Sequence, residues 1–342
     1  MSLISALKRK SNKIFFTTPS HGKSFCLFHK FYQWYRNDIS EVDAYSPQDA
    51  LESAEKWAAG IYGTKYTKFL TNGSTCGVIG AILASGCKNI FLWDNSHPCH
   101  KNGAELAGCS IIEYSMPIDE NLGIYKAITL DKVNEILKKY KDLESSALLI
   151  TSPTYEGFCA DIQEISKLCK EYGVKLIVDE AHGALYPFSD ELPTSAVKYA
   201  DYTVQSLHKT AGGINPTALL HSNDNNPTES LSKINTTSPS YPMLATIEAN
   251  IKFLNSPNGK KLIKNLTDNI KNLNLPLLND DITKILLKHS NLSGFELSEI
   301  LYEKYGIEDE RTNAKTTMLL CGIGTNKKMF SKLNKALKNL GF

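Results

Sequence analysis

The sequence lacks several features that mark specialised classes of protein. No apolar run reaches the roughly 18 residues that a membrane span needs, and the N-terminus has no hydrophobic signal region. The sequence also lacks an excess of charge of either sign: it has 38 Lys and Arg and 36 Asp and Glu, which gives a formal net charge of +2. So small an imbalance argues against a nucleic-acid or anionic membrane partner. We therefore expect a soluble, cytoplasmic protein that binds neither nucleic acid nor membrane.

The cysteine pattern excludes two further classes. Eight cysteines are present, but none forms a C-x-x-C pair and most lie in apolar or helical surroundings. A zinc site or a disulfide framework is therefore not expected, and reduced thiols without a metal are the simpler interpretation. The eight are Cys26, Cys76, Cys87, Cys99, Cys109, Cys159, Cys169 and Cys321.

Length and composition favour a large domain followed by a small one. The chain has 342 residues, with 42% hydrophobic and 22% charged, which fits about two well-packed domains. We expect an aromatic and basic arm over 1–46, which packs on another surface such as a second subunit. A large cofactor-binding domain is expected over 47–240, and a linking helix with a small α+β domain over 241–342. The stretch 260–279 is rich in Lys and Asn and is expected at the surface.

The segment from 66 to 221 alternates short apolar strands with helices, which predicts an α/β fold. Continuous apolar strands between helices indicate a mostly parallel sheet covered by helices on both faces. Ligands of such sheets bind beyond the carboxyl ends of the strands, so the loops after five strands should converge there. The expected strands are 66–70, 90–93, 110–114, 147–150, 175–178, 202–205 and 218–221.

Two side chains at strand ends suggest pyridoxal phosphate chemistry. Lys209 follows one apolar strand, and Asp179 ends the run Lys-Leu-Ile-Val-Asp about thirty residues earlier. A lysine amine can hold the cofactor aldehyde as a Schiff base, and an aspartate can keep the pyridine nitrogen protonated. Alone, Lys209 could be a solvated charge and Asp179 a helix cap or salt-bridge partner. Their order along the chain favours the cofactor interpretation.

Hydroxyl and glycine residues near these strand ends could hold a phosphate. Gly73, Ser74 and Thr75 open an apolar helix, whose free amides form an anion cradle. Serine and threonine also cap helices for purely structural reasons. Ser206 and His208 lie beside Lys209 and offer a second hydroxyl and an imidazole.

Two further histidines follow strands of the predicted sheet. His97 could stack over the pyridine ring, although an exposed loop histidine is the alternative. His182 could reach the phenolic oxygen of the cofactor or the substrate. The alternative, nearly as favoured, is that His182 only packs against its neighbours and has no functional role. His100 is assigned no functional role.

Taken together, these motifs resemble the ornithine/lysine/arginine decarboxylase family of fold-type-I pyridoxal phosphate enzymes. The similarity runs from about Pro47 to the C-terminus, and the order of the motifs is more specific than any one of them. The motifs are Leu-Thr-Asn-Gly-Ser-Thr at 70–75, Asn-Ser-His at 95–97, Thr-Ser-Pro-Thr-Tyr at 151–155, Asp-Glu-Ala-His-Gly at 179–183, Gln-Ser-x-His-Lys-Thr at 205–210, Thr-Ser-Pro-Ser-Tyr at 237–241 and Tyr-Gly-Ile-x-x-Glu at 305–310.

The resemblance implies a role for each matched residue. Lys209 would form the Schiff base, Asp179 would pair with the ring nitrogen and His97 would stack on the ring. Phosphate would be bound by Ser74, Thr75, Ser206 and His208, with Ser238 contributing across the interface of a homodimer that shares its active sites. Glu310 matches an acidic position near the substrate entrance or the distal cation of the substrate.

The activity implied by the resemblance is decarboxylation of a basic L-amino acid, arginine, lysine or ornithine, within polyamine metabolism. Another pyridoxal phosphate activity, such as aminotransfer, lyase chemistry or racemisation, would use the same Lys209 and Asp179. A non-catalytic relative is a further alternative. The chain departs from the family pattern at Asp94, where Arg is frequent, at Ser20, where Gly is frequent, and at Leu185, which replaces a second histidine.

Overall fold

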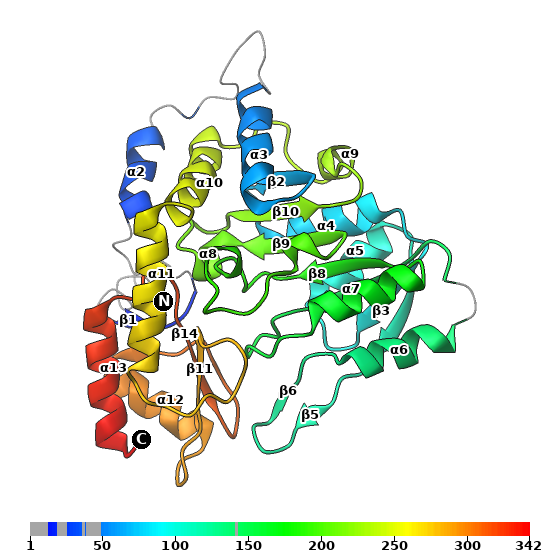
Figure 1. Cartoon of the computed structure of the whole chain (residues 1–342). Coiled ribbons are helices and arrows are strands. Elements are labelled where there is room, and N and C mark those ends of the chain that lie inside the picture. The colour runs from blue at the N-terminus through cyan, green and yellow to red at the C-terminus, as the bar shows by residue number, and fades with distance from the viewer. Residues whose placement is uncertain (1–12, 19–25, 36–37, 39–48, 141–142) are drawn as a thin grey trace, which may run out of the picture.

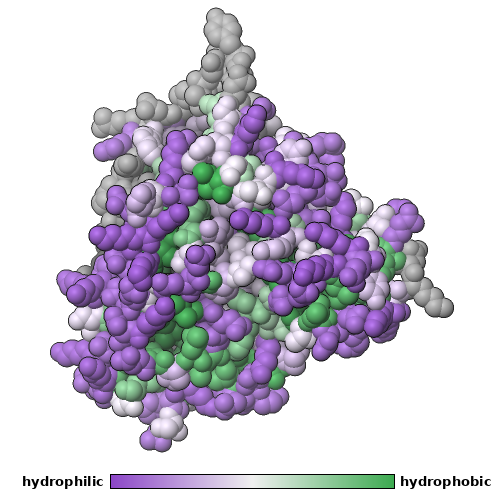
Figure 2. Space-filling model, viewed as in Figure 1, coloured by the Kyte–Doolittle hydropathy of each residue, from purple (hydrophilic) through white to green (hydrophobic). Residues whose placement is uncertain are grey.

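The computed structural model describes residues 13–18, 26–35, 38, 49–140 and 143–342, and Figure 1 shows their arrangement. A large α/β domain built on a seven-stranded sheet lies beside a smaller domain that contains the C-terminus. No helix in these ranges combines the length and apolarity needed to cross a membrane. In the space-filling view, hydrophobic side chains gather over the small domain, low on the displayed face (Figure 2).

The central sheet is mostly parallel, as predicted from the sequence. Its strand order is β2-β10-β9-β8-β7-β3-β4, and only β10 runs antiparallel to its neighbours. Each strand expected in this region is present, with bounds shifted by at most one residue. The strands are β2 (Tyr66–Leu70), β3 (Asn89–Trp93), β4 (Ser110–Tyr114), β7 (Ser146–Thr151), β8 (Lys175–Asp179), β9 (Tyr202–Ser206) and β10 (Ala218–Ser222).

Helices cover both faces of the sheet, which confirms the predicted layers (Figure 1). α4 (Gly73–Ser85) and α5 (Pro98–Leu106) share a core with one set of strand residues, including Ile90 and Leu92. α6 (Leu130–Lys139) and α7 (Ile162–Glu171) pack on the opposite face, where Phe91 lies. Successive residues of β3 thus point to opposite faces, and both are buried, so the strand reads as a continuous apolar run.

The small domain contains a three-stranded antiparallel sheet with the order β11-β14-β13. Its strands are β11 (Lys284–Leu287), β13 (Arg311–Thr312) and β14 (Thr317–Leu320), and its helices are α12 (Gly294–Glu303) and α13 (Lys327–Leu340). Ser293 and Glu296 form a capping box at the start of α12, which satisfies two backbone amides that a helix start leaves free. An α+β unit was expected here.

Two helices connect the domains, whereas one linking helix was expected from the sequence. α10 (Tyr241–Leu254) matches the expected linking helix. α11 (Pro257–Lys271) falls largely in the Lys- and Asn-rich stretch expected at the surface. Its lysines are exposed, but Ile263, Leu266 and Ile270 are buried in the core between the domains. The stretch therefore includes an amphipathic helix rather than surface chain alone.

The described parts of the N-terminal arm pack on the same chain. β1 (Ile14–Phe15) pairs in parallel with β12 (Ile307–Glu308) of the small domain, and Phe16 is fully buried. α2 (Cys26–Tyr35) lies beside α10 (Figure 1). The rest of the arm lies outside the described residues, and the large domain is described from α3 (Asp49–Tyr62) onward. The remaining elements are β5 (Ile118–Asp119), β6 (Ile124–Tyr125), α8 (Leu207–Thr210) and α9 (Thr228–Ser232).

Candidate active site

A cavity of about 310 Å³ lies at the carboxyl ends of the strands, where the sequence placed the ligand. Loops after β3, β7, β8 and β9 supply most of its wall, and Arg311 of the small domain closes one side. The structure brings His97, Asp179, His182 and Lys209 to this one cavity, together with Pro153 and Tyr155. Another cavity of about 320 Å³, between α3 and α10, has a largely apolar wall with Glu248 as its one charged residue, so it offers little for catalysis.

Lys209 lies on the short helix α8, where its amine contacts a second candidate residue, His182. The amine nitrogen Nζ lies 3.2 Å from Nε2 of His182. Burial lowers the pKa of Lys209, and the positive charge of Lys284 lowers it further, while Asp179 opposes the shift. A lysine with a lowered pKa holds more of its amine in the neutral, reactive form at neutral pH.

His182 is a buried neutral imidazole that can exchange a proton with Lys209. Burial and the charge of Lys209 hold the pKa of His182 well below its usual value. A protonated Lys209 therefore donates to Nε2, which leaves the hydrogen on Nδ1. That Nδ1 has no hydrogen-bond partner among the described residues. The ring also packs edge-on against Tyr155, with centroids 5.0 Å apart, so the surroundings fix its position.

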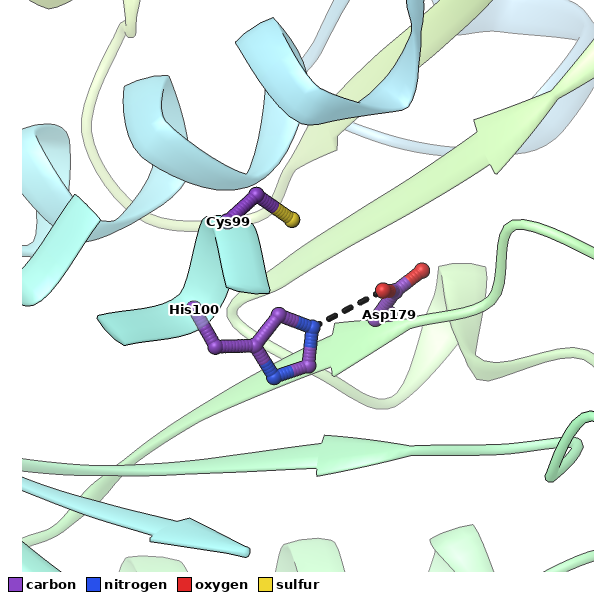
Figure 3. Close-up of side chains that lie close together, drawn as sticks. All are labelled: Cys99, His100 and Asp179. Atoms are coloured by element: carbon purple, nitrogen blue, oxygen red, sulfur yellow. Dashed lines mark hydrogen bonds and ion pairs between the residues drawn. The ribbon is translucent and has the colours of Figure 1, made fainter. Parts of the chain in front are cut away.

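Asp179 accepts two hydrogen bonds, one of them from a residue that the sequence analysis left without a role. The amide of Ala181 donates to Oδ1 over 3.1 Å, and His100 donates from Nε2 to Oδ2 over 2.9 Å. Figure 3 shows this imidazole pointing from α5 toward the carboxylate at the end of β8. Burial opposes ionisation, but His100 and Lys209 outweigh it, and the pKa of Asp179 lies below its ordinary value.

The tautomer of His100 follows from its surroundings. An ionised carboxylate only accepts hydrogen bonds, so the hydrogen must reside on Nε2. The other nitrogen, Nδ1, has no partner in the described part of the chain, and the residue is fully buried. His100 and Asp179 are 79 positions apart in the sequence, so no local pattern signalled this contact.

Cys99 completes a compact group with these two residues (Figure 3). Ligand atoms of Cys99, His100 and Asp179 all lie within 4.8 Å of one another, which is a spacing that could hold a metal ion. Burial raises the pKa of the Cys99 thiol to about 12, however, and the negative charge of Asp179 raises it too. The protonated thiol is a hydrogen-bond partner of His97, whose Nδ1 lies 2.9 Å from the Cys99 Sγ.

His97 and the start of α4 lie around the same end of the cavity. His97 is the N-cap of α5, and its Nδ1 accepts from the amide of Cys99 over 3.2 Å. Partial burial lowers the pKa of His97. Thr75, at the start of α4, favours the ionised form of the Cys99 thiol and so opposes the effect of burial on its pKa. Ser74 and Thr75 themselves lie outside the cavity wall.

The proposed phosphate residues fit an anion by two observations. The N-cap of α4, Asn72, makes no side-chain cap, so the first amides of that helix are open, and Gly73 adopts a φ of +77°. Ser206 is fully buried, and its hydroxyl has no partner among the described residues. His208 donates from Nδ1 to the carbonyl of Thr217 over 3.0 Å, which orients its ring. An uncapped helix start and an unsatisfied buried hydroxyl together suit a phosphate group.

Six residues suggested by the resemblance do not line the cavity: Ser74, Thr75, Ser206, His208, Ser238 and Glu310. Ser238 lies on an exposed loop, where its amide donates to Thr236 Oγ1 over 3.1 Å. Glu310 lies behind Tyr155 of the cavity wall, and its Oε1 accepts a hydrogen bond from the Tyr155 hydroxyl over 2.5 Å. Its Oε2 accepts from the amide of Thr18 over 2.7 Å and from the hydroxyl of Thr17.

Comparison with known proteins found similar sequences. Residues 3–285 match the family model described as Orn/Lys/Arg decarboxylase, major domain. The arginine decarboxylase of Bacillus anthracis is 29% identical over 370 residues, covering 97% of this chain and 74% of that protein. The arginine decarboxylase of Bacillus cereus is 28% identical, covering 97% of this chain and 80% of that protein.

Solved structures share the fold. Lysine decarboxylase A from Pseudomonas aeruginosa superposes with a TM-score of 0.76 at 16% identity, over 95% of this chain. This chain spans only 60% of the length of that protein. A serine palmitoyltransferase solved with its pyridoxal phosphate also superposes, with a TM-score of 0.70 at 16% identity, over 96% of this chain and 88% of that protein. The chain therefore has the fold of fold-type-I pyridoxal phosphate enzymes, as expected from the sequence.

Proposed function

Because the chain belongs to the Orn/Lys/Arg decarboxylase family, we propose that it is a pyridoxal phosphate-dependent decarboxylase of a basic L-amino acid. The observation that carries the proposal is the meeting of Lys209 and Asp179 at one cavity, each with a pKa shifted in the direction its role requires. Arginine is the first substrate to test, ahead of lysine and ornithine, because the near-full-length relatives are named arginine decarboxylases.

The residues matched by the resemblance would share the binding of the cofactor. Lys209 would hold the aldehyde carbon covalently, Asp179 would pair with the protonated ring nitrogen and His97 would cover the ring. Ser74, Thr75, Ser206 and His208 would bind the phosphate. Ser238 would add to this site across the interface of a homodimer with shared active sites, which sedimentation of the purified protein tests.

When bound, pyridoxal phosphate withdraws electrons from the α carbon of the substrate. The chain itself holds protons and excludes water. Ionised Asp179, fixed by His100 and Ala181, keeps a negative charge at the end of β8. Lys209 and His182 form a pair 3.2 Å apart that can pass a proton to or from the substrate carbon. The rings of Trp93 and Tyr155 and the side chain of Pro153 give the cavity apolar surface, which disfavours a carboxylate.

The test is an absorbance spectrum of the purified protein with pyridoxal phosphate, followed by a panel of L-amino acids. We expect a visible band from covalently held cofactor, and release of carbon dioxide and an amine from arginine, lysine or ornithine. Lys209→Ala should lose the band. Persistence of the band in that variant, or a keto acid in place of carbon dioxide, would refute the proposal, and the keto acid would point to aminotransfer.

A further inference from the structure

Two charged side chains of the cavity wall have no part in binding the cofactor. Glu156 lies on the loop after β7, and Arg311 begins β13 of the small domain. Nη1 of Arg311 lies 3.5 Å from Oε1 of Glu156. The guanidinium carbon of the same arginine lies 4.9 Å from the centre of the Tyr155 ring. A carboxylate and an aromatic face of the cavity thus already contact a guanidinium group.

Glu156 is poorly compensated for a buried carboxylate. The residue is only 8% exposed, and burial raises the pKa of Glu156 although Arg311 opposes the shift. The 3.5 Å separation is longer than the roughly 2.7–2.9 Å of a good charge-assisted hydrogen bond. A carboxylate can accept about four hydrogen bonds, so Glu156 has capacity left for a better placed cation.

The backbone that carries Glu156 is fixed, whereas the Arg311 side chain can move. Asn279 donates from Nδ2 to the carbonyl of Glu156 over 2.6 Å, and the amides of Asp280 and Asp281 donate to the carbonyl of Gly157 over 3.1 and 2.9 Å. These bonds hold the loop against the small domain. The Arg311 side chain is 54% exposed, so it can turn to solvent at little cost.

We propose that Glu156 and the face of Tyr155 receive the terminal cation of the substrate side chain, a guanidinium or ammonium group. Arg311 occupies this position in the free protein and turns to solvent when the substrate enters. The inference rests on the proposed function, because it takes the substrate to carry a side-chain cation. Glu310 lies behind the wall, where its two oxygens accept from three donors, and one of them is the hydroxyl of Tyr155.

The experiment compares L-arginine with L-citrulline, which has nearly the same shape but a neutral end. In the cofactor-loaded protein, Glu156→Gln should raise KM for arginine by about 10- to 100-fold, the range for losing a hydrogen bond to a charged group. KM for citrulline should change little, so the preference for arginine collapses. Glu310→Gln is the matched control, since it makes the same change in the neighbouring acid and should affect both compounds alike.

Arg311→Met gives an independent measurement if Glu156→Gln does not fold. Removing the competing cation should leave KM for arginine unchanged or lower it by up to about fivefold. An unchanged preference for arginine in Glu156→Gln would overturn the inference. So would a tenfold rise of KM in Arg311→Met, which would instead assign Arg311 to a substrate carboxylate.

Binding without turnover separates this inference from the proposed function. Each compound is titrated into loaded protein while the visible absorbance of the cofactor is followed. If the wild-type protein releases no carbon dioxide, but arginine still perturbs the spectrum and Glu156→Gln weakens that response, the Glu156 inference stands and the proposed function fails. If carbon dioxide is released and Glu156→Gln keeps the preference, the inference fails alone. If neither compound perturbs the wild-type spectrum, both fail.

Discussion

The hydrogen bond from His100 to Asp179 can be removed with little change in volume by His100→Leu. Asp179 would stay buried and keep only the amide of Ala181 as a direct donor. Losing a hydrogen bond to a charged group costs about 1.5–3 kcal/mol. At about 2.1 cal/mol/K of unfolding entropy per residue, a chain of 342 residues should melt about 2–4 °C lower. His100→Gln is the matched variant, because its amide can still donate to the carboxylate.

The pH dependence of this difference identifies Asp179 as the partner. The native pKa of Asp179 lies below its unfolded value, so its ionisation stabilises the native state above about pH 4 and this stability is lost as pH falls further. The amide introduced by His100→Gln would favour ionised Asp179, whereas burial is less opposed in His100→Leu, so the gap between the two variants should be constant near neutral pH and shrink as the pH falls through the Asp179 pKa of His100→Leu. Neither variant has an imidazole at position 100, so titration of that ring cannot imitate the effect.

The assay is urea unfolding of the cofactor-free variants between pH 7 and pH 3.5, with melting temperatures at pH 7. In the loaded protein the pyridinium would supply a second partner for Asp179, so the gap between the variants should narrow. Equal stability of His100→Leu and His100→Gln would refute the reasoning. So would a gap that stays the same down to pH 3.5, because the bond would then not depend on the charge of Asp179.

Three further changes test other parts of the structure. Burial raises the pKa of Glu180 to about 7 despite donors from Ser195, Ala196 and Gln205. Glu180 keeps its proton to a higher pH in the native state than in the unfolded state, so the free energy of unfolding should fall as the pH rises from about 4.5 to 7. In urea unfolding, Glu180→Gln should make the free energy of unfolding depend less on pH in this range. Lys209→Ala should release the cofactor on dialysis and slow turnover by at least about 10²–10⁴-fold, since it also removes a proton carrier. Gly157→Ala should destabilise the protein by about 1–3 kcal/mol in urea, because φ is +94° and a Cβ would lie 2.8 Å from Asn279 Nδ2. An unchanged free energy of unfolding in Gly157→Ala would contradict the inference that the loop carrying Glu156 is fixed.

The sequence predicted the layers of the large domain well because each buried strand is a continuous apolar run between turn residues. The same pattern could not show the direction of β10, whose residues look like those of its parallel neighbours. Direction depends on the connection instead. Residues 207–217 hold only the four-residue α8, which is too short for the crossover that a parallel strand requires. α11 was missed for a different reason: its lysines and asparagines dominate the composition, while Ile263, Leu266 and Ile270 mark one helical face.

The candidate site could be predicted only where one local segment carries the chemistry. Lys209 and Asp179 stand at strand ends, and the sheet rule brings such ends together. His100 and Asp179 are 79 positions apart, and the docking of α5 on the sheet decides that they touch. Glu156 and Arg311 belong to different domains, so no local pattern could pair them.

Two of the departures from the family pattern, Leu185 and Asp94, lie away from the cavity wall. Leu185 is fully buried in the core between the domains and does not line the cavity. Asp94 accepts from the Ser115 hydroxyl over 2.5 Å and also lies off the cavity wall. Neither residue therefore contributes directly to the shape or charge of the cavity wall. Besides Lys209 and Asp179, the charged residues of the wall are Glu156 and Arg311. The small domain positions both, because Asn279 holds the loop that carries Glu156 and Arg311 itself belongs to this domain. Substrate choice should therefore respond to changes in the small domain, while retention of the cofactor should respond to changes at the carboxyl ends of β8 and β9.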